Sequence, residues 1–364
     1  MRLATRGRLV TVIAAAGLVL SACGGSTATP APTAAPSAAV TAAPVVTDAP
    51  GTLPAPEQTS IKIGMSVTSE LSQYAVKLAE QAGLLKQYGF TNVEIIGFEG
   101  DGKAVQAMLA GQVDFITAGS SSVINSRLTD TPFKVIAMNS ILINDGLFCT
   151  KDIKTAADVK GKTVAVSTFG GTSHGSVLLS LKALGYTAAD VVITEVGGQS
   201  ARIAALQGGS IGCAPVDASM KADMEALGLN MLTNLVESGL AWGRSGLVST
   251  DEYLAKNPNT ALVLAAASLE AQNMLWTAPD EAAKYFAEFA QIDVADAAKL
   301  VKNFPLTGDR TMMWTADAFL APKEVLSTVQ PEMANVDVTT AYDQSFLQKL
   351  VDIGFYAKIG VPLP

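Results

Sequence analysis

The stretch TVAVSTFGGTSHGS, residues 163–176, decides the fold because it joins a short apolar run, a glycine turn and a polar helix start. The first four residues are β-branched or small, which favours a strand. Gly170 and Gly171 allow a sharp turn, and Thr172 or Ser173 can cap the following helix. Such a turn points backbone N–H groups and the positive end of the helix dipole at the space in front of it. The stretch predicts an α/β fold with a site for an anionic or polar ligand.

The same turn also fits a catalytic pattern. Residues 171–175, GTSHG, match the G-x-S-x-G nucleophile elbow of α/β-hydrolases. A serine nucleophile needs a general base, normally a histidine far along the chain. The chain has one histidine, His174, and it adjoins Ser173, where neighbouring side chains point in different directions. A ligand-binding turn is therefore favoured, no catalytic residue is expected, and a hydrolase using Ser173 remains the alternative.

A weak internal repeat predicts two similar lobes. The segments 62–69, 87–98 and 106–121 form a βαβαβ pattern, which is typical of parallel strands with crossover helices. Segments 162–171, 183–196 and 204–219 repeat them in the same order, about one hundred residues later. Chance similarity between two ordinary βαβ units is the alternative. The repeat favours two α/β lobes that face each other.

The remaining segments suggest how the lobes connect. Strand-like pairs at 133–149 and 231–249 are interpreted as two crossings between the lobes, and the chain turns helical from Pro258 onward. The predicted lobe boundaries are 60–147 with 246–364 for lobe 1 and 148–245 for lobe 2, with hinges near 140–150 and 236–248. The helical C-terminal part is expected to pack on lobe 1.

The first 59 residues are predicted to be a targeting segment and a tether. Residues 1–22 combine three arginines with an apolar run and small residues, as in a signal peptide. The run ends in Leu-Ser-Ala-Cys23, which resembles the lipobox of bacterial lipoproteins, so we expect Cys23 to be lipidated and to anchor the chain to the cell membrane. An ordinary signal peptide with a chance cysteine is the alternative. Residues 23–59 are rich in Ala, Pro and Thr, which predicts a disordered tether.

Composition excludes several classes of function. The chain has 364 residues, 49% of them hydrophobic, which is enough for two domains with sizeable cores. A net charge of −8 without a basic cluster argues against nucleic-acid binding. A single histidine and the absence of paired cysteine spacings argue against a metal site, and no cofactor is expected. Cys149 and Cys213 form either a disulfide or two buried thiols.

Three segments resemble the sulfonate/nitrate/taurine type of ABC-transporter substrate-binding proteins. These are residues 73–124 (QYAVKLAEQAG to AGSSSVI), 155–186 (TAADVKGKTVAV to LKALGY) and 249–286 (STDEYLAKNP to DEAAKYF). Gly212 departs from the pattern, because the family usually has an acid there. The resemblance implies a type II periplasmic-binding-protein fold, in which two hinged α/β lobes close on a ligand.

In such a fold the ligand lies at the carboxyl ends of the strands. Four loops meet that rule, at 66–69, 118–122, 167–173 and 216–219, and three of them are rich in hydroxyl groups. Each residue could instead be an ordinary loop residue; Asp217 could cap a helix, Trp242 could pack in the hinge, and His174 could be a plain first-turn residue. Arg127 and Arg244 are the two arginines that could approach the cleft. The candidate ligand contacts are Ser66, Thr68, Ser69, Ser120, Ser121, Phe169, Gly170, Gly171, Thr172, Ser173, Asp217 and Trp242.

The sequence therefore predicts an extracytoplasmic solute-binding protein of an ABC importer. It would capture a small polar or anionic organic solute between its lobes and deliver it to the transmembrane permease subunits. A monomer is expected. Besides the hydrolase, the alternative is a binding protein that serves a sensor.

Overall fold

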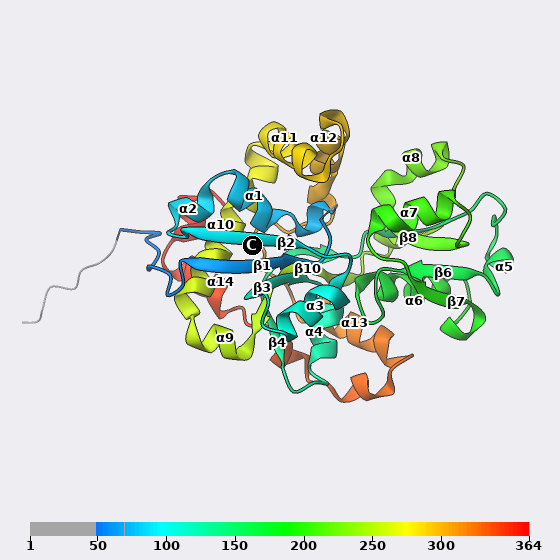
Figure 1. Cartoon of the computed structure of the whole chain (residues 1–364), viewed down its shortest axis with the longest axis horizontal. Coiled ribbons are helices and arrows are strands. Elements are labelled where there is room, and N and C mark those ends of the chain that lie inside the picture. Colours follow the sequence, from blue (N-terminus) through cyan, green and yellow to red (C-terminus); the bar gives the residue numbers. More distant parts are fainter. Residues whose placement is uncertain (1–48, 69, 364) are drawn as a thin grey trace, which may run out of the picture. The chain divides into compact units, whose positions relative to one another are not determined.

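The structure is a computed structural model that describes residues 49–68 and 70–363. The predicted signal peptide (1–22), the lipidation site Cys23 and most of the predicted tether lie outside the described residues, as does Ser69. The described residues form one compact unit. It contains two five-stranded sheets with helices around them (Figure 1).

The first sheet has the strand order β2-β1-β3-β10-β4. Strands β1, β2 and β3 are parallel, and β10 is antiparallel to both β3 and β4. Its strands are β1 Ser60–Met65, β2 Asn92–Gly97, β3 Phe115–Ala118, β4 Phe133–Leu142 and β10 Ala241–Thr250. Alternating Ile and Met side chains of β1 are fully buried, as expected for a central strand covered on both faces.

The second sheet has the strand order β7-β6-β8-β5-β9. Strands β6, β7 and β8 are parallel, and β5 is antiparallel to both β8 and β9. Its strands are β5 Asp145–Cys149, β6 Thr163–Val166, β7 Val192–Glu195, β8 Cys213–Asp217 and β9 Asn230–Asn234. The quoted stretch forms β6, its glycine turn and the start of helix α6, as the sequence predicts.

The chain passes twice between the sheets. Strand β4 lies in the first sheet and β5, only two residues later, lies in the second; β9 lies in the second and β10 in the first. The fourth strand in each sheet, β10 in the first and β5 in the second, therefore directly follows a strand of the other sheet along the chain. We call the part built on the first sheet lobe 1 and the part built on the second lobe 2.

Fifteen α-helices are described. Their bounds are α1 Ala75–Gln81, α2 Leu84–Gln87, α3 Asp101–Leu109, α4 Ser120–Ser126, α5 Ala156–Val159, α6 Thr172–Ala183, α7 Gln199–Gln207, α8 Lys221–Ala226, α9 Asp251–Lys256, α10 Pro258–Thr277, α11 Pro279–Ala290, α12 Val294–Asn303, α13 Asp317–Ser327, α14 Ser345–Asp352 and α15 Phe355–Lys358. Residues 71–88 form several short helical pieces, and Gly83, which adopts a left-handed conformation (φ 76°), separates α1 from α2.

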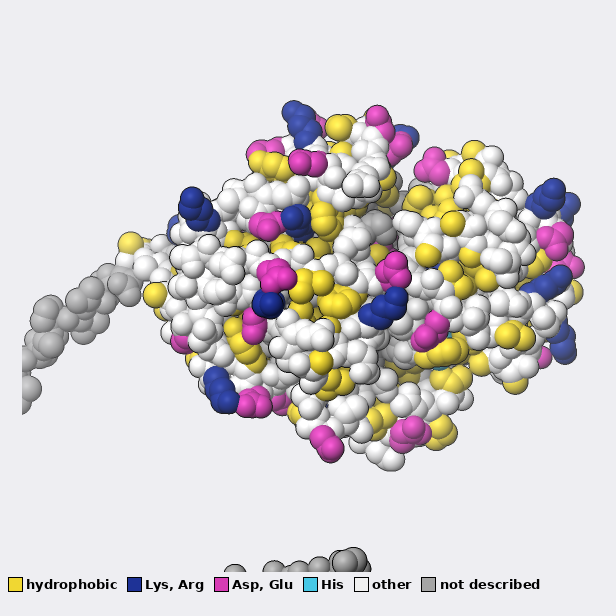
Figure 2. All heavy atoms as spheres, viewed as in Figure 1, with side chains coloured by type: hydrophobic (Ala, Val, Ile, Leu, Met, Phe, Trp, Pro, Cys, Tyr) yellow, Lys and Arg dark blue, Asp and Glu magenta, His cyan; other side chains and the backbone are white. Residues whose placement is uncertain are grey.

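The C-terminal helices enlarge the core of lobe 1. Helix α10 is almost entirely buried and belongs to the same apolar cluster as β1, β3 and β4, together with parts of α11 and α14. Lobe 2 has two small clusters instead, one on each face of its sheet. Charged side chains of both signs are scattered over the face shown in Figure 2, with no large patch of one sign.

The predicted tether is too long at its C-terminal end. The backbone N–H of Gly51 donates to the carbonyl oxygen of Ile353, and the Glu57 carboxylate accepts hydrogen bonds from the backbone N–H groups of Asn259 and Thr260. These contacts hold residues 51–58 on lobe 1, although their composition alone resembles that of the preceding tether. The Glu57 carboxylate accepts hydrogen bonds from free backbone N–H groups at the first turn of α10. Amino-acid composition does not predict this contact.

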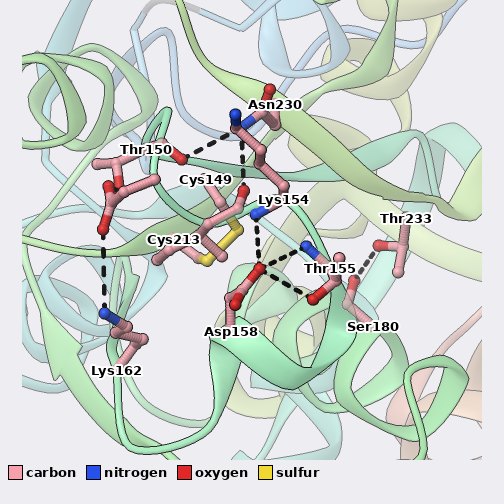
Figure 3. Close-up of a disulfide and its surroundings, with 12 residues drawn as sticks. Cys149, Thr150, Lys154, Thr155, Asp158, Lys162, Ser180, Cys213, Asn230 and Thr233 are labelled. Atoms are coloured by element: carbon pink, nitrogen blue, oxygen red, sulfur yellow. Dashed lines mark hydrogen bonds and ion pairs between the residues drawn. A yellow bond between two sulfur atoms is a disulfide. The ribbon is translucent and has the colours of Figure 1, made fainter.

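Cys149 and Cys213 form a disulfide, which decides between the two states left open by the sequence. The two cysteines stand opposite each other in the antiparallel pair of β5 and β8, so the bond crosses between neighbouring strands at the centre of lobe 2. Figure 3 shows it beside the helix α5 capping box of Thr155 and Asp158.

Candidate functional site

A small cavity lies where loops of both lobes meet at the carboxyl ends of the strands. It measures about 20 Å³, which is room for about one water molecule, so the two lobes are closed on each other around it. Its lining is almost entirely polar. The lining residues are Val67, Glu70, Gln73, Asp101, Asp145, Ser167, Thr172, Ser173, Arg202 and Arg244.

Arg244 joins carboxylates from both lobes. It stands on β10; its Nη1 donates to Asp145 Oδ1 at 2.9 Å, and its Nη2 donates to Glu70 Oε2 at 2.8 Å. Its exposed side-chain fraction is 5%, against 12% for Glu70 and 3% for Asp145. Burial on its own lowers the pKa of Arg244, but the two carboxylates outweigh it and raise that pKa. Arg244 therefore stays charged and holds a buried ion-pair triad at the hinge.

Asp145 ties this triad to the quoted stretch. Its second carboxylate oxygen accepts a hydrogen bond from the Ser176 hydroxyl on α6, and the Thr172 hydroxyl donates to the backbone carbonyl of Arg244 at 3.2 Å. The first two turns of α6 are thus fixed relative to the hinge strand β10.

Arg202 is the second buried guanidinium group of the lining. It lies on α7, where its Nε donates to the carbonyl oxygen of Pro215 at 3.1 Å and its Nη1 donates to that of Gly197 at 2.9 Å. It forms no salt bridge with any residue that the structure describes. Burial lowers its pKa. These carbonyl contacts fix the plane of the guanidinium group beside the cavity.

Two further carboxylates lie near the triad, of which Asp101 is buried and Asp217 is half-buried. Asp101, at the start of α3, accepts hydrogen bonds on Oδ2 from the Gly119 N–H at 3.2 Å and from the Ser122 hydroxyl at 2.8 Å. Asp217 accepts from Asn144 at 2.7 Å and from the Ser219 N–H at 2.9 Å. Burial raises the pKa of both carboxyl groups. The region between the lobes is therefore rich in acidic groups.

The glycine turn of lobe 2 packs directly on lobe 1. The Thr168 hydroxyl accepts a hydrogen bond from the backbone N–H of Gly102 at 3.2 Å. A Cβ atom on Gly171 would lie 3.1 Å from Thr168 Oγ1 and 3.7 Å from the Ser122 hydroxyl of lobe 1, and Gly170 has a positive φ of 75°. The two glycines are required here because the turn is sharp and the opposite lobe is close.

The structure disfavours a catalytic serine at this turn. The Ser173 hydroxyl contacts the Ser167 hydroxyl at 2.7 Å and accepts from the Ser167 N–H at 2.8 Å. His174 instead uses Nδ1 to accept a hydrogen bond from the Gly170 N–H at 3.1 Å, and burial lowers its pKa. The two side chains do not form the hydrogen bond that a serine–histidine pair needs. Within residues 49–68 and 70–363, no group of three or more metal-ligating side chains is present, and no helix is long and apolar enough to span a membrane.

Of the predicted contacts, Thr172 and Ser173 line the cavity. Gly170 and Gly171 shape the turn behind them, and Phe169 points to solvent with its ring against His174. Ser66 and Ser120 are buried and use their hydroxyls on backbone carbonyls, of Thr117 for Ser66 and of Gly243 and Ala318 for Ser120.

Several other predicted contacts lie away from the cavity wall. Ser121 is buried without a hydrogen-bond partner in the described chain, Thr68 packs near Gly97, and Asp217 caps a short 3-10 helix. Ser69 is outside the described residues. Arg127 pairs with Asp251 of α9 rather than approaching the cavity.

Trp242 does not face the cavity, which corrects its assignment as a ligand contact. Its ring is fully buried in a small hinge cluster with Ile143 and Leu235, and it lies against the helix face at Gly175, where an added Cβ would overlap the ring. The packing role, which the sequence left open, is the one observed. The sequence around Trp242 does not show which face of the crossing strand β10 its ring covers.

The sequence interpretation missed most of the charged lining. Glu70, Asp101, Asp145 and Arg202 were not selected, and Arg244 was considered only as a possible neighbour. Their positions in the chain are far apart, and they lie on different kinds of element: Asp145 begins β5, Arg244 lies in β10 and Arg202 lies in α7. The repeat could have pointed to two of these residues, because Asp101 and Arg202 lie on matching helices, α3 and α7, of the two repeated units.

Comparison with known proteins identifies the family of the chain. Residues 74–282 match the protein family described as NMT1/THI5 like. The chain is 27% identical over 251 residues to the taurine-binding periplasmic protein of Escherichia coli K12, a match that covers 66% of this chain and 77% of that protein.

Solved structures show the same arrangement of lobes. The alkanesulfonate-binding protein SsuA of Xanthomonas axonopodis pv. citri, bound to MOPS, superposes with a TM-score of 0.66 at 18% identity, over 80% of this chain and 99% of that one. The periplasmic nitrate-binding protein NrtA of Synechocystis PCC 6803 gives 0.66 at 18% identity, over 85% and 92%. The two-lobed α/β fold is thus one known from periplasmic binding proteins.

Proposed function

This chain belongs to the NMT1/THI5-like family, and we propose on that premise that it is the extracytoplasmic solute-binding protein of an ABC importer. It captures a small polar organic solute, of the sulfonate, taurine or nitrate kind or related to it, between lobes 1 and 2. The closed, liganded form then docks on the transmembrane permease subunits. The protein works as a monomer and performs no catalysis.

One observation carries this proposal: the cavity is built from both lobes and lies at the two crossings of the chain. Glu70 and Asp101 come from lobe 1, Arg202 and Ser173 from lobe 2, and Arg244 from the crossing strand β10. An organic solute is larger than this cavity, so it would enter with the lobes apart and would contact both lobes only when they close around it. Its binding energy would therefore favour that liganded closed state. This is the coupling that delivery to a permease requires.

The proposed ligand site retains the glycine turn predicted from the sequence. The backbone N–H groups and hydroxyls of Thr172 and Ser173 lie at the first turn of α6, where an acidic group of the solute would be favoured. The other predicted contacts would not touch the solute, but would shape the loops that carry Thr172 and Ser173.

The N-terminal segment is part of the proposal. A signal peptide at 1–22 and lipidation of Cys23 would anchor the protein to the bacterial cell membrane, because acyl chains add stable membrane affinity. Incorporation of labelled palmitate in wild type, lost in Cys23→Ala, is the expected result; equal labelling of both would contradict the anchor.

A thermal-shift screen with small sulfonates, amino sulfonates, nitrate and carboxylates tests the binding function. A solute at one hundred times its Kd should add roughly 2.7 kcal/mol to the free energy of unfolding. At least one class should raise the melting temperature in a concentration-dependent way. A screen in which no class raises it would contradict the function.

A further inference from the structure

The wall of the cleft cavity carries more carboxylates than guanidinium groups. Glu70, Asp101 and Asp145 stand against Arg202 and Arg244, so the fully ionised lining has one negative charge in excess. Asp217 lies near Arg244, and its negative charge helps to raise the pKa of that guanidinium group. An excess of negative charge disfavours a simple anion as the ligand.

Arg244 is already neutralised by the protein. Its two terminal nitrogens donate to Asp145 and Glu70 at 2.9 and 2.8 Å; Arg244 and Asp145 are buried, and the Glu70 side chain is 12% exposed. Breaking one of these buried pairs to bind a solute anion would leave a carboxylate without its cation, which is costly. Arg244 is therefore poorly suited to be the primary partner of an anionic ligand.

Among the described lining residues, Arg202 and the start of α6 are the features that favour an acidic group. Arg202 contacts only backbone carbonyls through Nε and Nη1, so its positive charge is not balanced by a direct pair with a described residue. Helix α6 has 12 residues and begins at Thr172, which lines the same cavity. Both features belong to lobe 2.

Lobe 1 presents the complementary feature. Glu70 uses Oε2 for Arg244, and its Oε1 accepts no hydrogen bond from any described residue. Asp101 lies in the same lining, with burial raising the pKa of its carboxyl group. A neighbouring cation would stabilise the ionised form of this carboxylate and offset that burial.

The following inference rests on the proposed function. We propose that the solute carries a cationic hydrogen-bond donor, such as an ammonium or amidinium group, and that Glu70 and Asp101 of lobe 1 accept its hydrogen bonds. An acidic group on the same solute faces Arg202 and the start of α6 in lobe 2. A simple anion would add a second uncompensated negative charge to a closed, poorly hydrated cleft, whereas a zwitterion adds none. Glu70 is thus the residue that discriminates amine-bearing solutes from plain anions.

Matched solute pairs that differ only by the amine test this directly. Isothermal titration calorimetry would compare taurine with ethanesulfonate, 3-aminopropanesulfonate with propanesulfonate, and β-alanine with propionate. The expected result is that at least one amine-bearing member binds at least tenfold more tightly than its amine-free partner.

Variants separate the role of Glu70 from a general loss of structure. Glu70→Gln keeps an oxygen that can accept from Arg244 but removes the charge; it should weaken binding of the amine-bearing solute at least tenfold more than binding of its amine-free partner. Glu332→Gln, at an exposed position outside the lining, is the matched control and should bind like wild type. Melting temperatures without solute show whether each variant is folded.

The outcomes distinguish this inference from the proposed function. An amine-free member that binds as tightly as its partner, or Glu70→Gln that leaves the amine-bearing solute unaffected, overturns the inference while the binding function stands. If none of the six solutes binds and the wider thermal-shift screen is also silent, the binding function fails, and the inference fails with it.

Discussion

The two sheets have the same strand arrangement but are stabilised differently. Each has three parallel strands in the order second, first, third, followed by an antiparallel strand supplied across the hinge. Lobe 1 is backed by the buried helix α10 and by α14, which extend a single large apolar cluster. Lobe 2 has two small clusters and a disulfide between β5 and β8. The repeated pattern sets the topology of a lobe, whereas its stability depends on what each lobe adds to that pattern.

Removing the disulfide should have the largest effect. The bond closes a loop with a sequence separation of 64 residues, and a cross-link of that size stabilises a protein by about 4 kcal/mol in the chain-entropy account. Cys149→Ala with Cys213→Ala should lower the free energy of unfolding of lobe 2 by that order. Hydrogen exchange should show lost protection in β5 and β8 while β1 and β3 stay protected. Equal loss in both sheets would contradict the difference between the lobes.

Crowding the hinge should have the next largest effect. An added Cβ at Gly175 would overlap the buried ring of Trp242, and overpacking of this kind costs about 1–3 kcal/mol. Gly175→Ala should therefore lower the melting temperature. Calorimetry of a bound solute should show nearly unchanged affinity, because Trp242 packs in the hinge. A large loss of affinity with no loss of stability would instead support a ligand contact at Trp242.

Detaching the N-terminal arm should affect lobe 1 alone. The Glu57 carboxylate accepts two backbone hydrogen bonds at the first turn of α10, an arrangement worth about 1 kcal/mol in helix-cap substitutions. Chemical denaturation of Glu57→Ala should show that loss, with Glu332→Gln as the control of similar charge change. Exchange protection in β6 and β8 should not change; if it falls, the arm stabilises more than lobe 1.

The single histidine should give the smallest effect, through pH. Burial lowers the pKa of His174 from its usual 6.5, so the unfolded chain takes up a proton at a pH where the folded imidazole is still neutral. The stabilisation is complete above pH 6.5 and falls as the pH drops through 6.5 toward the lower folded pKa. His174→Gln should flatten this part of the stability curve measured by denaturation. A curve with an unchanged slope would show that His174 is not buried as neutral imidazole.

The sequence predicted the topology better than the site. The repeat and the strand–turn–helix at 163–176 depend on local patterns, which survive in a single sequence, and both appear in the structure. The site depends on Glu70, Asp145 and Arg244, which are brought together only by the two crossings of the chain. Their neighbours in sequence carry no information about that meeting point. Composition likewise could not show that Glu57 fixes the arm, because one carboxylate among Ala and Pro residues looks like part of a tether.

Locking the lobes together tests the central claim, that a solute enters only when they separate. An added Cβ on Gly102 of lobe 1 would lie 3.2 Å from Cβ of Thr168 in lobe 2, so a small outward shift would bring the pair to the roughly 3.5–4.5 Å that a disulfide spans. Calorimetric titration of solute-free Gly102→Cys, Thr168→Cys protein should show no binding when oxidised, because the closed cavity of about 20 Å³ admits no organic solute. Mild reduction should restore the affinity of the wild type, since the native disulfide is fully buried. Unchanged binding by the fully cross-linked protein would contradict the claim.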